Sequence, residues 1–251
     1  RSPPLKAEPS AVRTLLDVQT VDSTLQQLAH RKKNLPQHAE LAELEERQSA
    51  LGSRRVELDT QIADLTRDQK KADADVEQVK ARRVRDQQRL DAGQVSSPRE
   101  LEQLQSEIVA LDRRIGVLED AELEVMEQLE SLQSELGGIA TEADELGGKV
   151  QSVTAARDEA VNELDASAAE ATGERERLVV DIPDQLMAVY ERMRAQLGGV
   201  GAAALRRRRC EGCRLELTEA DLAEIRSAPE DEVQRCPECN RILVRIAESG
   251  I

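Results

Sequence analysis

The sequence predicts a mainly α protein in which a long antiparallel coiled-coil helical hairpin precedes a small, cysteine-rich C-terminal module with short β-strands. Three observations support this. The 251 residues include no Trp or Phe, a single Tyr and 34% charged residues, which disfavours a large compact core. Apolar side chains recur every seven residues along much of the chain. All four cysteines lie near the C-terminus as two closely spaced pairs.

The first element expected is a helix over residues 10–34, which ends at the break marked by Pro36. We expect it to fold back beside residues 150–180. Residues 1–9 start with RSPPL and have no initiator Met, so they are expected to be a disordered N-terminus or an expression remnant. Residues 10–180 are therefore assigned to one domain, the hairpin.

The seam of the hairpin is clearest in its second half. One apolar row keeps a seven-residue step over Leu104–Ala160, and a second row over Ile108–Leu164 follows four places behind. Only Glu122 and Arg157 break the second row. Residues 44–79 repeat the step less cleanly. A seam sustained over this many heptads predicts a left-handed coiled coil.

The tip of the hairpin is predicted at residues 93–98. Gly93 can end one helix in a left-handed conformation, and Ser97, Pro98 and Glu100 form a start signal for the next. So short a loop makes the helices antiparallel neighbours, with residues whose numbers sum to roughly 190 side by side. That register sets arginines beside glutamates: Arg82, Arg83, Arg85 and Arg89 near Glu100, Glu102 and Glu107. Salt bridges are favoured there over a phosphate site.

Glycines at matching heights suggest a further feature of the hairpin. The register places Gly52 level with Gly137 and Gly138. Glycine costs about 1 kcal/mol inside a helix, so its coincidence on both helices needs a reason. We expect a joint or a close approach of the two backbones at this height.

The cysteines predict a metal site. Cys210 and Cys213 form one C-x2-C pair, and Cys236 and Cys239 form another after 22 intervening residues. Two such pairs can direct four thiolates at one tetrahedral centre, which is typical of one structural Zn²⁺ in a zinc ribbon. A redox pair would need a βαβ unit, and disulfides would need an oxidising compartment. A closed four-sulfur site has no open position for catalysis, and no other catalytic constellation is visible, so no enzyme is expected.

Residues 181–251 are assigned to a connecting helix plus the C4 zinc ribbon. The helix over 183–194 carries one apolar face, which packs on its own chain or docks a partner through Tyr190 and Met193. The ribbon is expected to contain two strand segments and a short helix: residues 200–204, residues 242–246, and the segment after Thr218.

Four consecutive arginines precede the first cysteine pair: Arg206, Arg207, Arg208 and Arg209. A zinc ion with four thiolates carries a net −2 charge, so neighbouring arginines have a structural reason to be present. Contact with phosphate is the alternative. In a strand, alternation would send two of them to each face, and the chain lacks the aromatic side chains on which single-stranded bases stack.

Charge and hydropathy limit the classes of partner that the chain is expected to bind. Residues 99–172 hold 5 basic and 19 acidic side chains, out of a net charge of −15 for the chain. This acidity opposes non-specific nucleic-acid binding by the hairpin and favours protein partners. No apolar run is long enough to span a bilayer and no signal peptide is recognisable, so we expect no membrane association and a cytoplasmic location. A monomer is the simplest expectation, with a dimer left open.

The combination resembles bacterial coiled-coil proteins with a C-terminal C4-type zinc ribbon domain. The resemblance is carried by SPRELEQLQSEI at residues 97–108, the helix over 186–194, and the knuckles CEGC and CPECNRIL. It implies zinc at the four cysteines and an adaptor that contacts proteins or nucleic acid, with no known catalysis. Asn240 stands where such ribbons often have Gly, and Asn tolerates the left-handed conformation.

Two functions therefore stay open. One is a zinc-binding adaptor that binds partner proteins through its coiled coil and its zinc ribbon. The other is a regulatory protein that binds RNA or DNA and contacts phosphate through the ribbon and the four arginines 206–209.

Overall fold

The computed structural model describes residues 5–251, which form two compact units. Unit 1 contains the described residues up to His38 together with Ala155–Ile251, and unit 2 contains Ala39–Thr154. Within residues 5–251, no helix combines the length and the apolar character needed to cross a bilayer.

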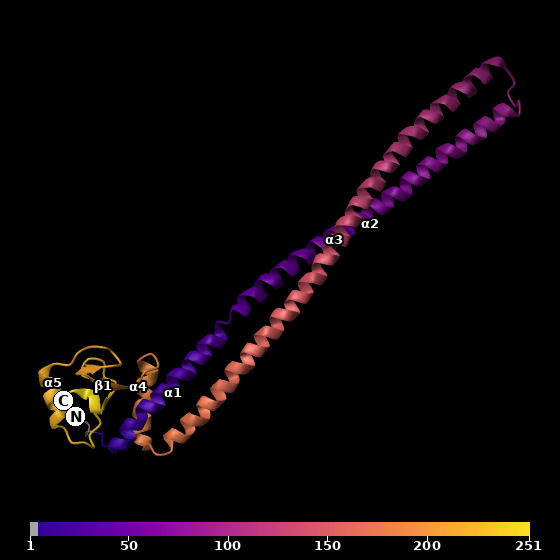
Figure 1. Ribbon diagram of the computed structural model, residues 1–251. Coiled ribbons are helices and arrows are strands. Elements are labelled where there is room, and N and C mark those ends of the chain that lie inside the picture. Colours follow the sequence, from indigo (N-terminus) through magenta and orange to yellow (C-terminus); the bar gives the residue numbers. More distant parts are fainter. Residues whose placement is uncertain (1–4) are drawn as a thin grey trace. The chain divides into compact units, whose positions relative to one another are not determined.

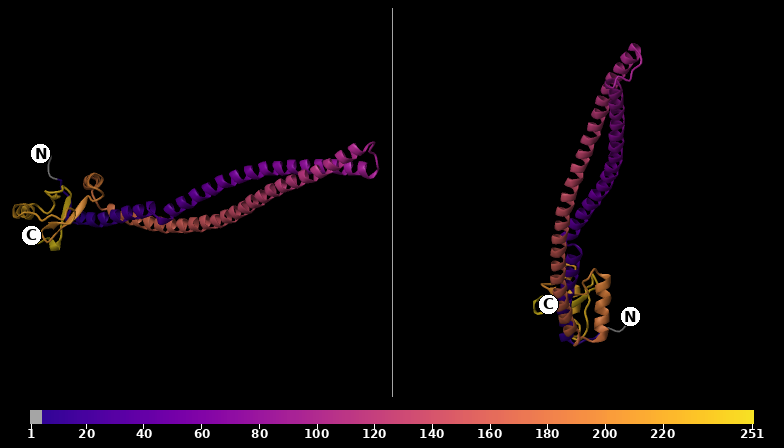
Figure 2. Two further views of the ribbon diagram at one scale, coloured as in Figure 1. Left: turned by 90° about the horizontal axis from the view of Figure 1, so that it is seen from above. Right: turned by 90° about the vertical axis from the view of Figure 1, so that its right-hand side faces the viewer.

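Unit 2 is an antiparallel two-helix coiled coil formed by nearly all of α2 (Pro36–Asp91) and the part of α3 (Pro98–Val179) that precedes Ala155, which run side by side in Figures 1 and 2. At the tip, Gly93 has a φ of 63°, the left-handed conformation that was predicted. Ser97 Oγ accepts a hydrogen bond of 3.2 Å from the Glu100 N–H. The Glu100 carboxylate accepts one of 2.9 Å from the N–H of Ser96, one residue earlier than a standard capping box has it.

Salt bridges between the helices fix the register. Four of them join residues whose numbers sum to 189: Arg47–Glu142, Arg54–Glu135, Arg82–Glu107 and Arg89–Glu100. The predicted register is therefore confirmed. Of the four tip arginines, Arg82, Arg83 and Arg89 pair with acidic side chains of α3 as predicted, whereas Arg85 forms no salt bridge among the described residues. Each exposed pair contributes about 0.2–1 kcal/mol, so these pairs set alignment more than stability.

The seam of unit 2 buries a narrow apolar stripe. Its buried side chains belong to the predicted seven-residue rows and include Leu58, Val76, Leu104, Ile108, Ile139 and Leu146. The predicted glycine contact is wrong. A Cβ added at Gly52, Gly137 or Gly138 would meet no atom within 4 Å, and both helices continue through these positions.

Unit 1 contains a small sheet covered on both faces by helices and loops. Its strands have the order β2-β1-β3, with β2 antiparallel and β3 parallel to β1. The elements of this unit, besides the end of α3, are α1 (Pro9–Lys33), α4 (Asp184–Gln196), β1 (Ala202–Arg206), β2 (Arg209–Cys210), α5 (Glu219–Ser227), β3 (Ile242–Arg245) and the 3-10 helix η1 (Ala247–Ser249). Thr218 caps α5 as expected, accepting a hydrogen bond of 3.2 Å from the Asp221 N–H.

The sheet separates two small cores by strand alternation. On β1, Ala202 belongs to a core shared with α1 and α4, whereas Ala203 and Leu205 belong to a core shared with α5 and the knuckles. On β3, Ile242 and Val244 face the first core and Leu243 faces the second. The strand pattern predicted for 242–246 thus reflects a strand that is buried on both faces.

The N-terminal segment differs from the expectation of disorder. Residues 1–4 lie outside the described residues, but Leu5 and Ala7 form backbone hydrogen bonds with Val233 and Asp231, at 2.9 and 2.8 Å. Helix α1 then packs its apolar face against the sheet and α4 within unit 1, and Leu15 is fully buried there. The hairpin domain expected at residues 10–180 is therefore divided differently, because α1 and the end of α3 pack with the ribbon.

Candidate metal centre

The two knuckles share one backbone design. In the first, the Cys210 N–H donates to the Leu215 carbonyl at 3.1 Å; in the second, the Cys236 N–H donates to the Arg241 carbonyl at 2.9 Å. Each donor and acceptor are five residues apart. These bonds close both loops in the same way, so each presents its two cysteines on one side.

A left-handed residue follows the second cysteine of each knuckle. Arg214 has a φ of 64° and Asn240 a φ of 62°. The N–H of Arg214 donates to the Cys210 carbonyl at 2.7 Å, and the N–H of Asn240 donates to the Cys236 carbonyl at 2.8 Å. The expectation for Asn240 is confirmed. Arg214 holds the equivalent place, which the sequence did not reveal because arginine rarely adopts this conformation.

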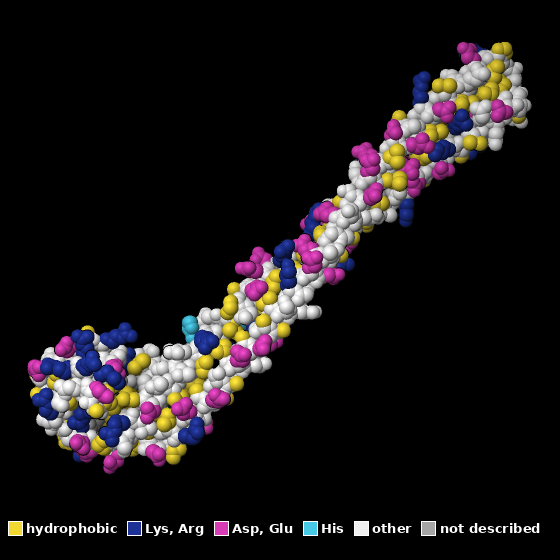
Figure 3. All heavy atoms as spheres, viewed as in Figure 1, with side chains coloured by type: hydrophobic (Ala, Val, Ile, Leu, Met, Phe, Trp, Pro, Cys, Tyr) yellow, Lys and Arg dark blue, Asp and Glu magenta, His cyan; other side chains and the backbone are white. Residues whose placement is uncertain are grey.

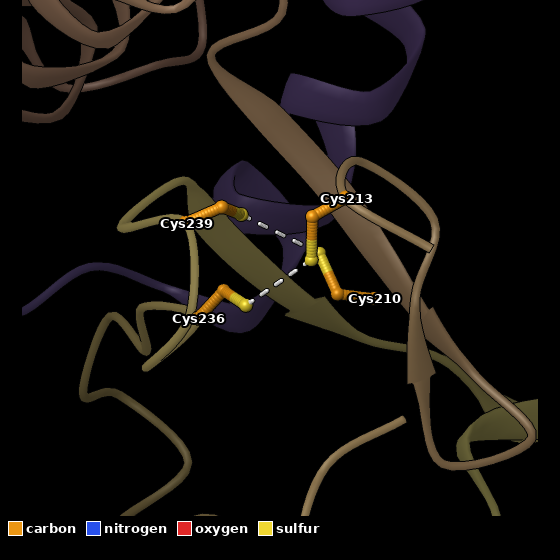
Figure 4. A group of neighbouring side chains, drawn as sticks. All are labelled: Cys210, Cys213, Cys236 and Cys239. Carbon is orange, nitrogen blue, oxygen red and sulfur yellow. Dashed lines mark hydrogen bonds between the residues drawn. The ribbon is translucent and has the colours of Figure 1, made fainter. Parts of the chain in front are cut away.

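The four predicted sulfurs converge from the two loops (Figure 4). All four Sγ atoms lie within 4.8 Å of one another, and the Cys210–Cys239 and Cys213–Cys236 pairs are each separated by 3.9 Å. A tetrahedron with zinc–sulfur bonds of about 2.3 Å has sulfur–sulfur edges of about 3.8 Å. A disulfide would need about 2.05 Å. The donor set therefore fits one structural zinc ion.

Burial and hydrogen bonding shift the pKa values of three of the thiols in different directions. Burial raises the pKa of Cys210 and of Cys236. For Cys239, burial acts in the same direction, but hydrogen bonds from the backbone and side chain of Arg241 outweigh it and lower the pKa to about 7. Zinc binds thiolates, so loading the site releases protons.

Arg241 is the cation beside the sulfurs, and the sequence analysis did not single it out. Its side chain donates to the carbonyls of Val200 and Leu197, each at 2.9 Å, and it hydrogen-bonds Cys239. It thereby connects the second knuckle to the end of α4. The arginine within CPECNR was the available signal, but its role depends on contacts that lie about 40 residues away in sequence.

The four consecutive arginines occupy a hairpin turn. Arg206 of β1 pairs with Arg209 of β2, while Arg207 and Arg208 between them have φ values of 46° and 65°. This is the two-residue turn with positive φ that normally takes Asn and Gly. The prediction of a continuing strand with two arginines on each face is therefore wrong, because the chain reverses at the run itself.

Three of these arginines are held by glutamates of the ribbon. Arg206 lies 2.8 Å from Glu211, Arg209 lies 3.4 Å from Glu216, and Arg208 forms an ion pair with Glu219. Arg207 is exposed and has no acidic partner among the described residues. Lys and Arg side chains gather over the ribbon in Figure 3, yet the run at its hairpin is largely neutralised locally.

A buried polar cluster joins α1, α3 and α4 in unit 1. Asp22, which is 2% exposed, accepts hydrogen bonds of 2.7 Å from the Tyr190 hydroxyl and from Arg175 Nε. Arg194 Nη1 lies 3.1 Å from the same carboxylate. Burial and the hydrogen bond to Asp22 raise the pKa of Tyr190. We name Asp22, Tyr190, Arg175 and Arg194 the Asp22 cluster.

The Asp22 cluster continues into the segment before β1. Gln19 Oε1 accepts a hydrogen bond of 2.7 Å from the Gly201 N–H, and its Nε2 donates to the Gly199 carbonyl at 2.9 Å. The docking role considered for Tyr190 and Met193 is wrong, because both side chains are buried within the unit. The sequence analysis did not predict the cluster. The available indication was that two polar residues, Gln19 and Asp22, lie on the otherwise apolar face of α1.

Comparisons with known proteins agree with both parts. A family model described as "CT398-like coiled coil hairpin domain" matches residues 18–198, and one described as "C4-type zinc ribbon domain" matches residues 209–243. The uncharacterized protein Rv2229c of Mycobacterium tuberculosis is 35% identical over 242 residues, which cover 96% of this chain and 98% of that protein. The uncharacterized protein ML1638 of Mycobacterium leprae is 29% identical over 226 residues, 88% of this chain and 95% of that protein.

Solved structures are similar as well. A Mycobacterium smegmatis protein superposes with a TM-score of 0.82 at 36% identity, covering 96% of this chain and 100% of that chain. CT398 from Chlamydia trachomatis superposes with a TM-score of 0.70 at 18% identity, covering 94% and 98%, and shares the fold.

Proposed function

Because the chain belongs to the CT398-like coiled-coil hairpin family and carries a C4-type zinc ribbon, we propose that it is a non-enzymatic, zinc-binding adaptor. Its coiled coil and its ribbon bind partner proteins. In this function neither the coiled coil nor the ribbon catalyses a reaction. Each offers a binding surface whose structure is stabilised by the contacts described above.

The observation that carries the proposal is the neutralisation of the arginine run. A phosphate-binding surface needs cations that are free to pair with phosphates and so release the counterions condensed on the nucleic acid. Here Arg206, Arg208 and Arg209 already face glutamates of the ribbon. The acidic stretch of α3 adds repulsion for nucleic acid. Proteins are therefore the partners that the charge distribution favours.

The zinc site supports the non-enzymatic part of the proposal. Four sulfurs fill a tetrahedral zinc, so the bound ion offers no position for a substrate or a water. The ion supplies the folding energy of a segment with few large apolar groups. We expect the adaptor to act in the cytoplasm, where the thiols stay reduced for the metal.

Site-specific photocrosslinking tests the proposal. A photoreactive amino acid is placed, one position at a time, at exposed sites of α3 and of the ribbon in cells that produce the protein. Discrete protein adducts that survive nuclease treatment are expected, identical between replicates and absent without irradiation. Adducts that disappear with nuclease would refute the adaptor function.

One observation favours nucleic acid as the second candidate. Arg207 and Arg208 hold positive φ values in an exposed turn, a strained conformation that proteins tend to keep at functional sites. A titration of labelled RNA and duplex DNA at two salt concentrations, with the native chain and with Arg206–Arg209→Ala, separates the two. Tight binding that weakens steeply with salt and vanishes in the variant supports this candidate; no binding at low salt excludes it.

A further inference from the structure

One face of unit 2 combines exposed apolar side chains with unpaired acidic ones. Glu119, Leu123, Met126 and Glu130 are spaced four, three and four residues apart, so they form one stripe on the surface of α3. Asp73 of α2 borders the stripe, because its carboxyl group is close enough to that of Glu122 to raise the pKa of Glu122. We call these residues, with Glu122, the α3 stripe.

The apolar part of the α3 stripe is well exposed. Leu123 is 56% and Met126 is 42% exposed, and they are three residues apart on the same side of the helix. Single exposed apolar residues are common and need no explanation. Two large ones side by side are only partly covered by the hairpin, and a partner that covered both would gain the burial of the exposed remainder. Methionine also adapts its shape to different partners.

Most of the acidic side chains around this pair lack a basic partner among the described residues. No Lys or Arg occurs on α3 between Arg114 and Lys149. Of the acids at positions 119–130, Glu119 meets Lys80 at 2.7 Å. The others form no salt bridge among the described residues: Asp120, Glu122, Glu124, Glu127 and Glu130. Elsewhere along the hairpin, five acids of α3 pair with an Arg of α2: Glu100, Glu107, Asp112, Glu135 and Glu142.

The clearest sign of missing cations is the contact between Asp73 and Glu122. The two carboxyl groups lie next to each other across the helices, and the proximity of Asp73, with burial, raises the pKa of Glu122. Two neighbouring carboxylates, one at the seam (Glu122) and one beside it (Asp73), repel each other and destabilise the coiled coil. A Lys or Arg from outside the chain would relieve the repulsion and complete the pattern of pairs along the seam.

We propose that the α3 stripe is a docking site for a basic amphipathic helix of a partner protein. The partner's apolar side covers Leu123 and Met126, and its Lys or Arg side chains lie against Asp73, Glu122 and Glu130. The proposal rests on the adaptor function above and names one of its surfaces. Nucleic acid is repelled by these charges, and a second copy of this chain, at a net −15, offers poor complementarity.

The test uses the full zinc-loaded chain and three synthetic peptides. The first peptide places Leu on one helical face and Lys on the other, the second has the same composition in scrambled order, and the third has Glu in place of Lys. Binding is measured by fluorescence anisotropy at two salt concentrations. We expect the first peptide to bind at least about tenfold more tightly than the other two, since only it matches both the apolar pair and the charge.

Variants locate the site. Leu123→Ser/Met126→Ser is expected to weaken the first peptide about tenfold, and Asp73→Asn/Glu122→Gln to weaken it and flatten its salt dependence. Val117→Ser is the matched control, because Val117 is equally exposed on α3 but lies outside the stripe. Helical circular dichroism should be unchanged in all three variants. Equal binding of the scrambled peptide, or equal affinity for Leu123→Ser/Met126→Ser and Val117→Ser, would overturn the docking site.

Crosslinking separates this proposal from the adaptor function. A photoreactive residue at position 123 should capture a nuclease-resistant protein adduct that one at position 117 does not. Adducts from the ribbon but none from position 123 would overturn the α3 stripe and leave the adaptor function standing. An absence of protein adducts at every position would overturn both.

Discussion

Replacing Asp22 by Asn tests how strongly the Asp22 cluster holds unit 1 together. The change keeps the shape of the side chain and removes its charge. The wild-type carboxylate receives hydrogen bonds from Tyr190 and Arg175 and a close contact from Arg194. Asn keeps one acceptor and brings an amide N–H₂ that points at these donors.

The expected loss follows from these contacts. Removing one partner of a buried ion pair costs about 3–5 kcal/mol when the other partner is left uncompensated. Arg175 and Arg194 keep 23% and 34% of their side-chain surface exposed, so water partly compensates them. Tyr190 is fully buried and gains no such relief. We therefore expect the free energy of unfolding of unit 1 to fall by about 3 kcal/mol.

The assay uses the chain's own probe. Tyr190 is the one aromatic residue of the sequence and sits inside the cluster, so its fluorescence during urea denaturation reports on unit 1. Asp165→Asn is the control, since it removes an exposed pair with Lys32 and should cost less than about 1 kcal/mol. A loss for Asp22→Asn no larger than that of the control would refute the reasoning.

Three further predictions concern the metal, the tyrosine and a glycine. Cys236→Ser should lower the zinc content below one ion per chain and remove amide protection from residues 200–250 while the helical signal of unit 2 stays; retained stoichiometric zinc would contradict the ligand set. Tyr190 has a pKa raised above its ordinary value of about 10, so its contribution to stability is complete below that pH and is lost above it, by about 1.4 kcal/mol per pH unit. Tyr190→Phe should lack this alkaline loss in chemical denaturation measured by circular dichroism, and an identical pH profile for both proteins would exclude it. Gly52→Ala should raise the thermal stability of unit 2 by about 1 kcal/mol, because the added methyl meets open space; destabilisation would mean that the glycine is needed.

Much of unit 2 could be predicted because the interactions that stabilise it are close in sequence or repeat with the seven-residue period. The seven-residue rows, the turn at Gly93 and the charge pairing all follow from residues close in sequence or related by one register. The cysteine spacing likewise encodes the metal site, since each knuckle is closed by bonds within five residues.

The rest of unit 1 could not be predicted, because it depends on contacts between distant segments. Asp22 and Tyr190 are 168 residues apart in the sequence, and the residues that flank either one do not indicate that the two side chains form a hydrogen bond. The turn at Arg207 and Arg208 was missed for a different reason: arginine is a poor residue for positive φ, so local propensity predicted a strand. The exposure of Leu123 and Met126 was equally hidden, since a coiled-coil pattern shows which side chains are buried and not which exposed ones matter.

The contact between residues 5–7 and residues 231–233 has a consequence for synthesis. Lys6 pairs with Asp231, 225 positions later, and Leu5 and Ala7 bond to the same late segment. At roughly 5–20 residues per second, the ribosome needs roughly 10–45 s to supply that partner. During this interval the apolar face of α1, including Leu15 and Val18, has no sheet to cover it. This apolar face is therefore exposed to aggregation while the hairpin is still being made, and unit 1 can close only after β3 has been synthesised.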